Sequence, residues 1–471
     1  MRFEYIDHDT SRSVRPLILL FAGWGMSPAP FAGLTRSGYD IAVVWDYRDL
    51  SAPWLNLLTP HREIAVVAWS YGVHAAARFM ESHPGLNITA RIAVNGTRFT
   101  ADDTRGIPRA IFDATLAGLD TRAVTKFNMR MCGGGEAYRR FASMAPDRPV
   151  DELREELQSF DTAPAPYMMW DKAFISSDDR IIPPANQHNA WSGEAVEIIP
   201  LDGPHLPDFG MILRMGLNDK GLIEQCFRKA EPTYDEHATM QLATASRLID
   251  LASQHINSPV SRMIEVGCGT GRSTEMALER FKPAKAILYD LHISPQVESL
   301  AREYTAGKIS TLSCDAESEI MSQPDSSADL IISASTAQWF NSFRAFLSQV
   351  ARVLVPGGIC AISTYGPDTM REIHTAMGTT CRFPDIDTIS HRIIPPQLQV
   401  LSVSEERDTL LMPSAIDALT HIKRTGVNGT GHRPSDRGLA FGKELLRNYP
   451  LDPQGRAPLT YHPIYMILRK P

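Results

Sequence analysis

The chain has 471 residues, of which 43% are hydrophobic and 21% charged, and its formal net charge is −7. These proportions are typical of a folded globular protein, and the length exceeds what one hydrophobic core usually supports, so we expect two domains of about 200 residues each. The negative charge argues against nonspecific nucleic-acid binding, which favours a basic surface. The N-terminus lacks the basic start and apolar core of a signal peptide, and the apolar run at 17–21 is too short for a membrane span. We therefore expect a cytoplasmic protein.

The cysteines show neither a C-x-x-C pair nor the spacing of a zinc site. We expect them to be buried free thiols in a reducing compartment, and we expect no bound metal. They are Cys132, Cys226, Cys268, Cys314, Cys360 and Cys381.

The first half of the chain alternates short apolar runs with helical stretches. This pattern is typical of a parallel sheet that helices cover on both faces, which is an α/β fold. A polar, mostly helical segment from about 101 to 165 interrupts the alternation, and we expect it to form a cap over an active site. The expected strands are residues 16–21, 40–45, 64–69, 91–96 and 195–200.

A second alternating series begins after about residue 216, and the short polar stretch 217–221 is the best boundary. The sequence therefore predicts two α/β domains, 1–216 and 217–471. A helix is expected at 341–354. The expected strands of the second domain are 263–267, 286–291, 308–314, 328–334 and 358–364.

Ser70 lies in the segment Ala-Trp-Ser-Tyr-Gly, directly after the apolar run 64–69. This segment is a variant of G-x-S-x-G in which Ala68 replaces the first glycine. The strand-to-helix turn needs small residues such as Ala68 and Gly72 because the backbone packs closely there. The pattern predicts a serine nucleophile at the start of a helix.

A serine hydroxyl needs a base to accept its proton and an acid to orient that base, and α/β-hydrolases supply them in the order Ser, Asp, His. Asp178 and Asp179 are the candidate acids, and His205 is the candidate base. We favour Asp179 because an Asp followed by an apolar pair and proline resembles the acid loop of this fold. Other histidines lie on or beside the nucleophile helix, and we interpret them as structural. They are His61, His74 and His83.

The oxyanion of an acyl-transfer reaction needs two N–H donors. The residue after the nucleophile, Tyr71, supplies one backbone N–H, and the segment FAGWGM at 21–26 is expected to supply the second from Trp24. A lone S-x-G is a weak signal, but four elements in the expected order predict a serine hydrolase.

A glycine loop follows the apolar run at 263–267. Its acidic residue Glu265 is typical of S-adenosylmethionine enzymes, whereas the dinucleotide pattern G-x-G-x-x-G would need glycine where Arg272 stands. Gly267, Gly269 and Gly271 would let the backbone approach the tail of the cofactor.

Two further acids fit the same cofactor. Asp290 ends the next expected strand and can accept hydrogen bonds from both ribose hydroxyls, and Asp315, after the third strand, is placed to contact the adenine amine. Each is also compatible with an ordinary strand-end residue. Together with Glu265 they predict a Rossmann-like class I S-adenosylmethionine-dependent methyltransferase.

The second half of the chain resembles the BioC family, the malonyl-[acyl-carrier protein] O-methyltransferases of biotin synthesis. The resemblance covers most of 218–471 and is strongest outside the glycine loop, which many methyltransferases share. The segments that carry it are TYDEHATMQ (233–241), EVGCGTG (265–271), AQWF (337–340), STYGPDTMREI (363–373), KRTGVNGT (423–430) and LTYHPIYMI (459–467).

The first half resembles the BioG family, the pimeloyl-[acyl-carrier protein] methyl ester esterases, over roughly 1–216. The segments that carry this resemblance are FAGWGM (21–26), AWSYGVHAA (68–76), DDRIIPPANQ (178–187) and GPHLPDF (203–209). It implies an α/β-hydrolase fold with a helical cap.

The two resemblances imply one bifunctional enzyme that methylates the malonyl carboxyl with S-adenosylmethionine and later hydrolyses the pimeloyl methyl ester, with an acyl-carrier protein as partner. Tyr234, Gln241, Gln338 and Trp339 are candidates for covering the cofactor or the acyl group, with simple packing as the alternative. The residues alone leave two other interpretations open. The chain could be a generic esterase fused to a methyltransferase of another small carboxylate, or one half could be a non-catalytic carrier-binding module.

Overall fold

The computed structural model describes residues 1–471 except 10–14, 60, 62, 161–162 and 428–437. The last three residues of the KRTGVNGT segment, 428–430, therefore lie outside the described residues. The chain forms two compact units, Met1–Leu217 and Asn218–Pro471. Among the described residues, no helix is both long enough and apolar enough to cross a membrane.

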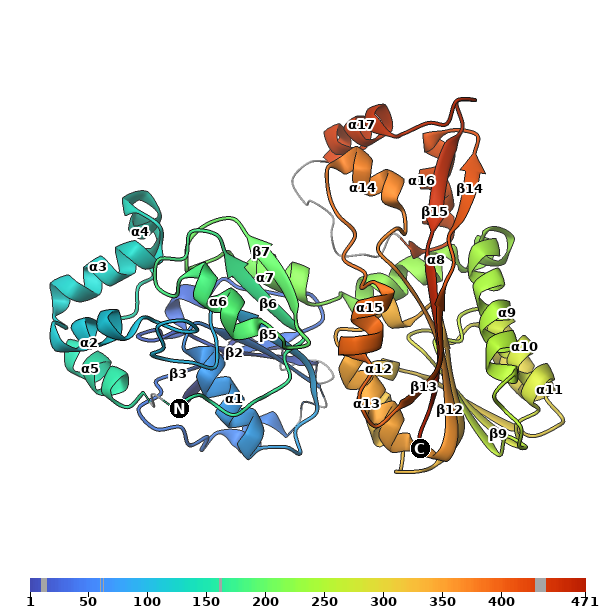
Figure 1. Cartoon of the computed structure of the whole chain (residues 1–471), viewed down its shortest axis with the longest axis horizontal. Coiled ribbons are helices and arrows are strands. Elements are labelled where there is room, and N and C mark those ends of the chain that lie inside the picture. The colour runs from blue at the N-terminus through green and yellow to red at the C-terminus, as the bar shows by residue number, and fades with distance from the viewer. Residues whose placement is uncertain (10–14, 60, 62, 161–162, 428–437) are drawn as a thin grey trace. The chain divides into compact units, whose positions relative to one another are not determined.

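The first unit contains a seven-stranded sheet in the order β1-β3-β2-β4-β5-β6-β7 (Figure 1). All neighbours pair in parallel except β1, which runs antiparallel to β3 at one edge. The apolar pattern of the sequence did not predict the edge strand β1 or the inner strand β6. The strands are β1 Arg2–Asp7, β2 Leu17–Phe21, β3 Asp40–Trp45, β4 Ile64–Trp69, β5 Ile88–Val94, β6 Lys172–Ser176 and β7 Glu197–Leu201.

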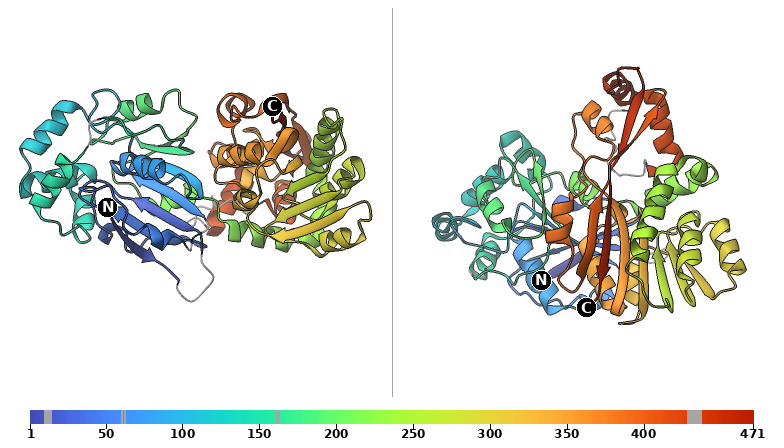
Figure 2. Two further views of the ribbon diagram at one scale, coloured as in Figure 1. Left: turned by 90° about the horizontal axis from the view of Figure 1, so that it is seen from below. Right: turned by 45° about the vertical axis from the view of Figure 1, so that its right-hand side comes forward.

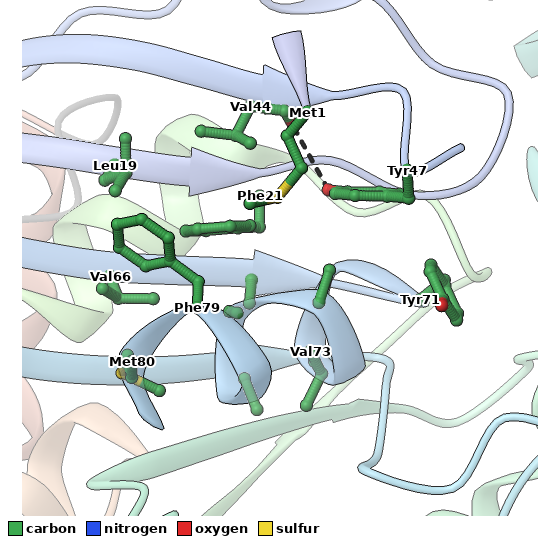
Figure 3. Close-up of a cluster of buried hydrophobic side chains, with 14 of the residues drawn as sticks. Met1, Leu19, Phe21, Val44, Tyr47, Val66, Tyr71, Val73, Phe79 and Met80 are labelled. Atoms are coloured by element: carbon green, nitrogen blue, oxygen red, sulfur yellow. Dashed lines mark hydrogen bonds between the residues drawn. The ribbon is translucent and has the colours of Figure 1, made fainter. Parts of the chain in front are cut away.

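Alternate residues of the inner strands enter two separate hydrophobic cores. In β2, Leu19 and Phe21 pack on the side of helix α1 with Phe79, whereas Ile18 and Leu20 pack on the opposite side with helix α7. Figure 3 shows the first of these cores between the sheet and α1. The continuous apolar runs follow from burial on both faces of the sheet. The covering helices are α1 Gly72–Ser82, α6 Pro184–Trp191 and α7 Phe209–Gly216.

Four helices inserted between β5 and β6 form the expected cap (teal in Figures 1 and 2). Helix α3 is capped at its N-terminus by Asp120, whose side chain accepts a hydrogen bond from the backbone N–H of Ala123. The cap also reaches the loop after β2, because α5 contributes Leu153 and Leu157 to the core beside α1. The cap helices are α2 Arg109–Ala117, α3 Thr121–Met131, α4 Gly135–Ala142 and α5 Val150–Gln158.

The second unit contains a seven-stranded sheet in the order β10-β9-β8-β11-β12-β16-β13, with helices on both faces (Figures 1 and 2). The first five strands run parallel, and β16 is antiparallel to both β12 and β13. This order is that of a Rossmann-like methyltransferase. The strands are β8 Arg262–Val266, β9 Lys285–Asp290, β10 Lys308–Ser313, β11 Ala328–Ala334, β12 Leu354–Tyr365, β13 Gln399–Glu405 and β16 Pro463–Arg469.

A two-stranded sheet and several helices extend from this core between β12 and β16 (Figure 1). The apolar pattern of the sequence did not predict β13 or any later strand. The small sheet pairs β14 Asp408–Met412 with β15 Ala457–Tyr461. The helices of the second unit are α8 Lys220–His237, α9 Thr239–Ser253, α10 Arg272–Phe281, α11 Pro295–Glu303, α12 Ala316–Glu319, α13 Phe343–Val353, α14 Arg371–Met377, α15 Ile386–Thr388, α16 Ala415–Arg424 and α17 Gly438–Asn448.

The segment 233–241, which carries Tyr234 and Gln241, belongs to two helices. The backbone leaves the helical conformation at Ala238, where ψ is 38°, so Tyr234 belongs to α8 and Gln241 to α9.

Substituting Gly72 with Ala tests the tight packing at the start of α1. A Cβ atom at Gly72 would lie 2.3 Å from the carbonyl oxygen of Phe21, whereas one at Gly85 would meet nothing within 4 Å. We expect Gly72→Ala to lower the free energy of unfolding of the first unit by about 1–3 kcal/mol, and the matched change Gly85→Ala to leave it nearly unchanged. Chemical denaturation followed by tryptophan fluorescence measures this unit, since six of the seven tryptophans lie in it. Equal stability of the two variants would contradict the packing argument.

Candidate active sites

Ser70 occupies a strained turn between β4 and α1. Its φ is +59°, in the left-handed region that non-glycine residues rarely adopt. The turn is closely packed, because a Cβ at Gly96 would lie 2.4 Å from the Ser70 carbonyl oxygen. The short distances at Gly72 and Gly96 explain why small residues flank this turn.

The structure brings Ser70, His205 and Asp179 together from three loops at the carboxyl ends of strands. The Ser70 Oγ lies 2.9 Å from His205 Nε2, and Asp179 Oδ2 lies 2.7 Å from His205 Nδ1. All three side chains are buried. Asp178, the alternative acid, instead pairs with Arg180 at the surface, 3.0 Å away.

Further hydrogen bonds that the sequence analysis missed hold the acid and the base in place. Asp179 Oδ1 accepts the backbone N–H groups of Ile181 and Ile182 at 2.8 and 3.0 Å, and Oδ2 accepts from Gln187 Nε2 at 2.8 Å. The loop of His205 is fixed through its carbonyl oxygen, which accepts from Asn95 Nδ2 at 2.9 Å. Gln187 lies on helix α6, eight positions after Asp179, so a helix predicted over the segment PPANQ would have placed it close to the acid loop.

The histidines interpreted as structural have other partners. His61 Nε2 lies 2.8 Å from the Tyr5 hydroxyl, and His83 Nδ1 lies 2.8 Å from the Phe79 carbonyl oxygen. His74 Nδ1 lies 3.1 Å from Thr100 Oγ1. None of these contacts involves Ser70.

The two expected oxyanion donors lie next to Ser70. Tyr71 is the N-cap residue of α1. Trp24 follows Gly23, where an added Cβ would lie 3.2 Å from the Ser70 Cβ. The loop after β2 thus runs directly beside the nucleophile.

The second unit contains a cleft at the carboxyl ends of β8, β9 and β10. This is the edge where open parallel sheets bind ligands. The cleft residues that bear on the argument are Lys220, Glu231, Tyr234, Gly267, Gly269, Thr270, Asp290, His292, Asp315 and Trp339.

The glycine loop and Asp290 form the centre of this cleft. Gly267, Gly269 and Gly271 have φ values of +80°, +54° and +91°. A Cβ at Gly267 would lie 2.0 Å from Thr336 Oγ1, whereas at Gly269 it would meet open space. Asp290 Oδ2 accepts the N–H of Gly269 at 2.8 Å, and the carboxyl still lines the cleft, as recognition of a ribose diol requires.

Glu265 lies behind the cleft and does not line it. Its Oε1 accepts a hydrogen bond from Ser273 Oγ at 2.7 Å, and its Oε2 has no hydrogen-bond partner among the described residues. Burial raises the pKa of Glu265 to about 7, and the Ser273 hydrogen bond partly offsets this effect. Ser273 lines a second pocket that shares the glycine loop. In that pocket, only the Ser273 hydroxyl would separate a cationic group from the Glu265 carboxyl. The pocket therefore fits the ammonium group in the tail of S-adenosylmethionine.

Asp315 is the N-cap residue of α12 and lines the cleft, but it also pairs with Lys220 at 3.2 Å. Lys220 begins α8, although it lies in the polar stretch 217–221 that marks the expected domain boundary. The residues of LNDKG resemble a polar linker locally, so only the fold reveals this contact.

Helix α8 covers the cleft through side-chain contacts with its loops. Glu231 Oε2 lies 3.1 Å from His292 Nε2, and Thr270 Oγ1 donates to Asp235 Oδ1 at 2.7 Å. Tyr234, a candidate covering residue on the same helix, lines the cleft.

Two of the other three candidate covering residues line these two pockets. Gln241 lines the second pocket, and Trp339 lines the cleft. Both side-chain atoms of the Gln241 amide and the Trp339 Nε1 are buried without a hydrogen-bond partner among the described residues. Gln338 is held by its own loop, because its Nε2 donates to the Ser335 carbonyl oxygen at 2.6 Å.

The fold and the two sites define an enzyme with an esterase unit followed by a methyltransferase unit. Family comparisons agree, since residues 1–210 match the family described as pimeloyl-ACP methyl esterase BioG and residues 264–362 match a methyltransferase domain family. The malonyl-[acyl-carrier protein] O-methyltransferase of Bacteroides fragilis is 35% identical over 464 residues, covering 96% of this chain and 92% of the relative. The chain belongs to this methyltransferase family.

Other relatives match one unit each. The malonyl-[acyl-carrier protein] O-methyltransferase of Bacteroides helcogenes is 32% identical over 274 residues, covering 53% of this chain and 98% of its own length. The crystal structure of BioG from Haemophilus influenzae is 33% identical and covers 44% of this chain and 94% of that chain, with a TM-score of 0.38.

The raised pKa of Glu265 predicts that the affinity for S-adenosylmethionine depends on pH. Below pH 7 the carboxyl is mostly protonated and neutral in the free protein, so binding a cationic tail there requires loss of a proton. We expect the Kd of S-adenosylmethionine to rise as the pH falls from 8 to 6, by at most about tenfold. Titration calorimetry at several pH values measures this. Glu265→Gln is the control, because the amine of S-adenosylmethionine titrates in the same way with both proteins. Parallel plots of Kd against pH for the parent and Glu265→Gln would contradict the prediction.

Proposed function

We propose that this chain methylates the free carboxyl of malonyl-[acyl-carrier protein] and hydrolyses pimeloyl-[acyl-carrier protein] methyl ester to the free acid and methanol. The observation that carries the proposal is the hydrogen-bonded Ser70–His205–Asp179 set in the same chain as a glycine-loop cleft. Each of the two units, Met1–Leu217 and Asn218–Pro471, would be the domain for one reaction.

In the methylation, the acceptor is already a nucleophile, because a malonyl carboxylate is ionised at neutral pH. When bound, S-adenosylmethionine supplies an electrophilic methyl group on a sulfonium. The protein then has to align the carboxylate with that methyl group and exclude water. Asp290 would hold the ribose, Asp315 the adenine amine, and the loop from Gly267 to Gly271 the tail, with α8 covering them.

In the hydrolysis, Ser70 Oγ attacks the ester carbonyl while His205 Nε2 accepts its proton. Asp179 stabilises the resulting imidazolium. The backbone N–H groups of Trp24 and Tyr71 would stabilise the oxyanion. His205 then protonates the departing methoxide, methanol leaves, and a water molecule activated by the same histidine releases the free acid.

The two reactions are linked by one charge. An ionised carboxylate at the end of an acyl chain would lose its hydration in an apolar enzyme tunnel, which is severely unfavourable. Methylation removes that charge before chain elongation, and hydrolysis restores it afterwards. The esterase unit should therefore discriminate against the short malonyl ester, because hydrolysing it would undo the first reaction.

We further propose that the cap binds the acidic carrier protein. Helices α3 and α4 expose five basic side chains, whereas the whole chain carries a net charge of −7. Met129, an exposed apolar side chain, lies among them with a fractional exposure of 41%. Such a face suits an acidic partner that also buries apolar contacts. The basic residues are Arg122, Lys126, Arg130, Arg139 and Arg140.

Separate loss of the two activities tests the proposed division of labour. We expect Ser70→Ala to lower the kcat of ester hydrolysis by about 10⁴-fold or more, because it removes the nucleophile, and to leave methylation intact. Asp290→Ala should abolish methylation at moderate donor concentrations and leave hydrolysis intact. Mass spectrometry of the carrier-bound acyl group measures both reactions. Loss of both activities in either variant would contradict two independent sites.

Charge reversal tests the carrier surface. We expect Arg139→Glu with Arg140→Glu to raise the KM for the carrier-bound ester about tenfold and to leave hydrolysis of a small soluble ester unchanged. Reversal of Arg302 and Lys308, both exposed on the second unit, changes the net charge equally and is the matched control. An equal loss with the small ester, or an equal effect in the control, would overturn the assignment.

A further inference from the structure

The loop after β2 is held in place by the cap. This loop, 22–26, contains Trp24, flanked by two glycines, and Gly25 has a φ of +75°. The Trp24 indole N–H donates to the Leu153 carbonyl oxygen on α5 at 3.1 Å, and the Gly25 N–H donates to Glu156 Oε2 at 3.3 Å. Glycines on both sides make the loop flexible by itself, so these contacts determine where its N–H groups point.

Glu156 is a buried carboxylate with no exposed surface. Besides Gly25, it accepts hydrogen bonds from Arg148 Nη1 at 2.7 Å and from the Tyr47 backbone N–H at 2.9 Å. Burial raises the pKa of Glu156, and the Arg148 guanidinium opposes that effect. A buried carboxylate is tolerated when its oxygens are matched by donors in this way.

The contacts of Arg148 and Tyr47 extend the same connection. Arg148 Nη1 also donates to the Met26 carbonyl oxygen at 3.3 Å, and its guanidinium lies 3.5 Å from Asp46, which follows β3. The Tyr47 hydroxyl donates to the Ala22 carbonyl oxygen at 2.6 Å. Both ends of the 22–26 loop are therefore bonded to residues that Glu156 contacts.

The cap also contacts the other expected oxyanion donor. The Tyr71 ring stacks on Phe160, just beyond α5, with ring centroids 3.3 Å apart and planes inclined by 6°. The segment that begins with α5 thus packs against both expected oxyanion donors.

We propose that Glu156 is a positioning residue for ester hydrolysis, and that the cap, through Glu156 and Trp24, assembles the oxyanion site instead of merely covering it. This inference rests on the proposed role of Ser70 as the nucleophile. It implies that the ester substrate meets a complete site only when α5 is seated on the 22–26 loop.

The change Glu156→Gln tests this proposal. An amide nitrogen in the place of either oxygen would face an N–H donor, so the loop should shift. We expect kcat for a small soluble ester to fall about 10- to 100-fold, less than for complete loss of an oxyanion donor, with KM changed less than about twofold. Glu155→Gln is the matched control, because Glu155 is the neighbouring residue, is 64% exposed and pairs with Arg48. Its kcat should equal that of the parent.

A second variant separates positioning from folding. Trp24→Phe keeps an aromatic ring against Phe127 but removes the hydrogen bond to Leu153, so it should lower kcat with an unchanged KM. If both residues act through the same loop, the loss in the double variant should be smaller than the product of the single losses. Thermal unfolding of each variant shows whether the first unit is folded, and the methylation rate shows that the second unit is unaffected. If Glu156→Gln does not fold, the kcat of Trp24→Phe alone tests the proposal.

The outcomes are distinct. A lowered kcat in folded Glu156→Gln with non-additive loss in the double variant supports the proposal. A kcat within about twofold of the parent, an equal loss in Glu155→Gln, or no effect of Trp24→Phe overturns it. If Ser70→Ala retains hydrolysis, the proposed function itself fails, whereas an inactive Ser70→Ala beside a fully active Glu156→Gln removes only this inference.

Discussion

Both sites depend on one constraint, which is that the inner strands of each sheet are covered by apolar side chains on both faces. A polar side chain in the middle of such a strand would be buried at a cost in free energy, so the polar functional groups lie at the strand ends. In the first unit, Ser70 follows β4 and Asp179 follows β6. In the second, the glycine loop follows β8 and Asp290 ends β9. In both folds, the candidate site residues therefore lie at the carboxyl ends of the parallel strands.

The two units act on the same kind of carboxyl group in different charge states, as a charged carboxylate in one and as a neutral ester in the other. The methyltransferase site receives a carboxylate that is already charged, so it needs alignment and the exclusion of water more than a base. The esterase site must create an oxyanion and stabilise it, so it needs fixed N–H donors. The buried Arg148–Glu156 pair beside the 22–26 loop and the α8 contacts over the cleft of the second unit are the features that would meet these two needs in our proposal.

Much of each site was predictable from sequence because its residues belong to short local patterns. The elbow around Ser70, the acid at Asp179 and the glycine loop all depend on neighbours within a few positions. The strand β6 was missed because its run KAFIS is short and has a polar residue at each end. Glu156 could not be singled out, since Glu152, Glu155 and Glu156 look alike on a polar helix. Only the fold shows that Glu156 alone of these three meets Gly25.

The central claim is that one chain masks a carboxylate and later restores it. Its most direct test is mass spectrometry of carrier-bound malonate after incubation of the full chain with S-adenosylmethionine, and of carrier-bound pimeloyl methyl ester without it. The account predicts that the malonyl group gains one methyl group and that the pimeloyl ester loses one as methanol. A malonyl group that stays unmethylated, or a pimeloyl ester that stays intact, would contradict it.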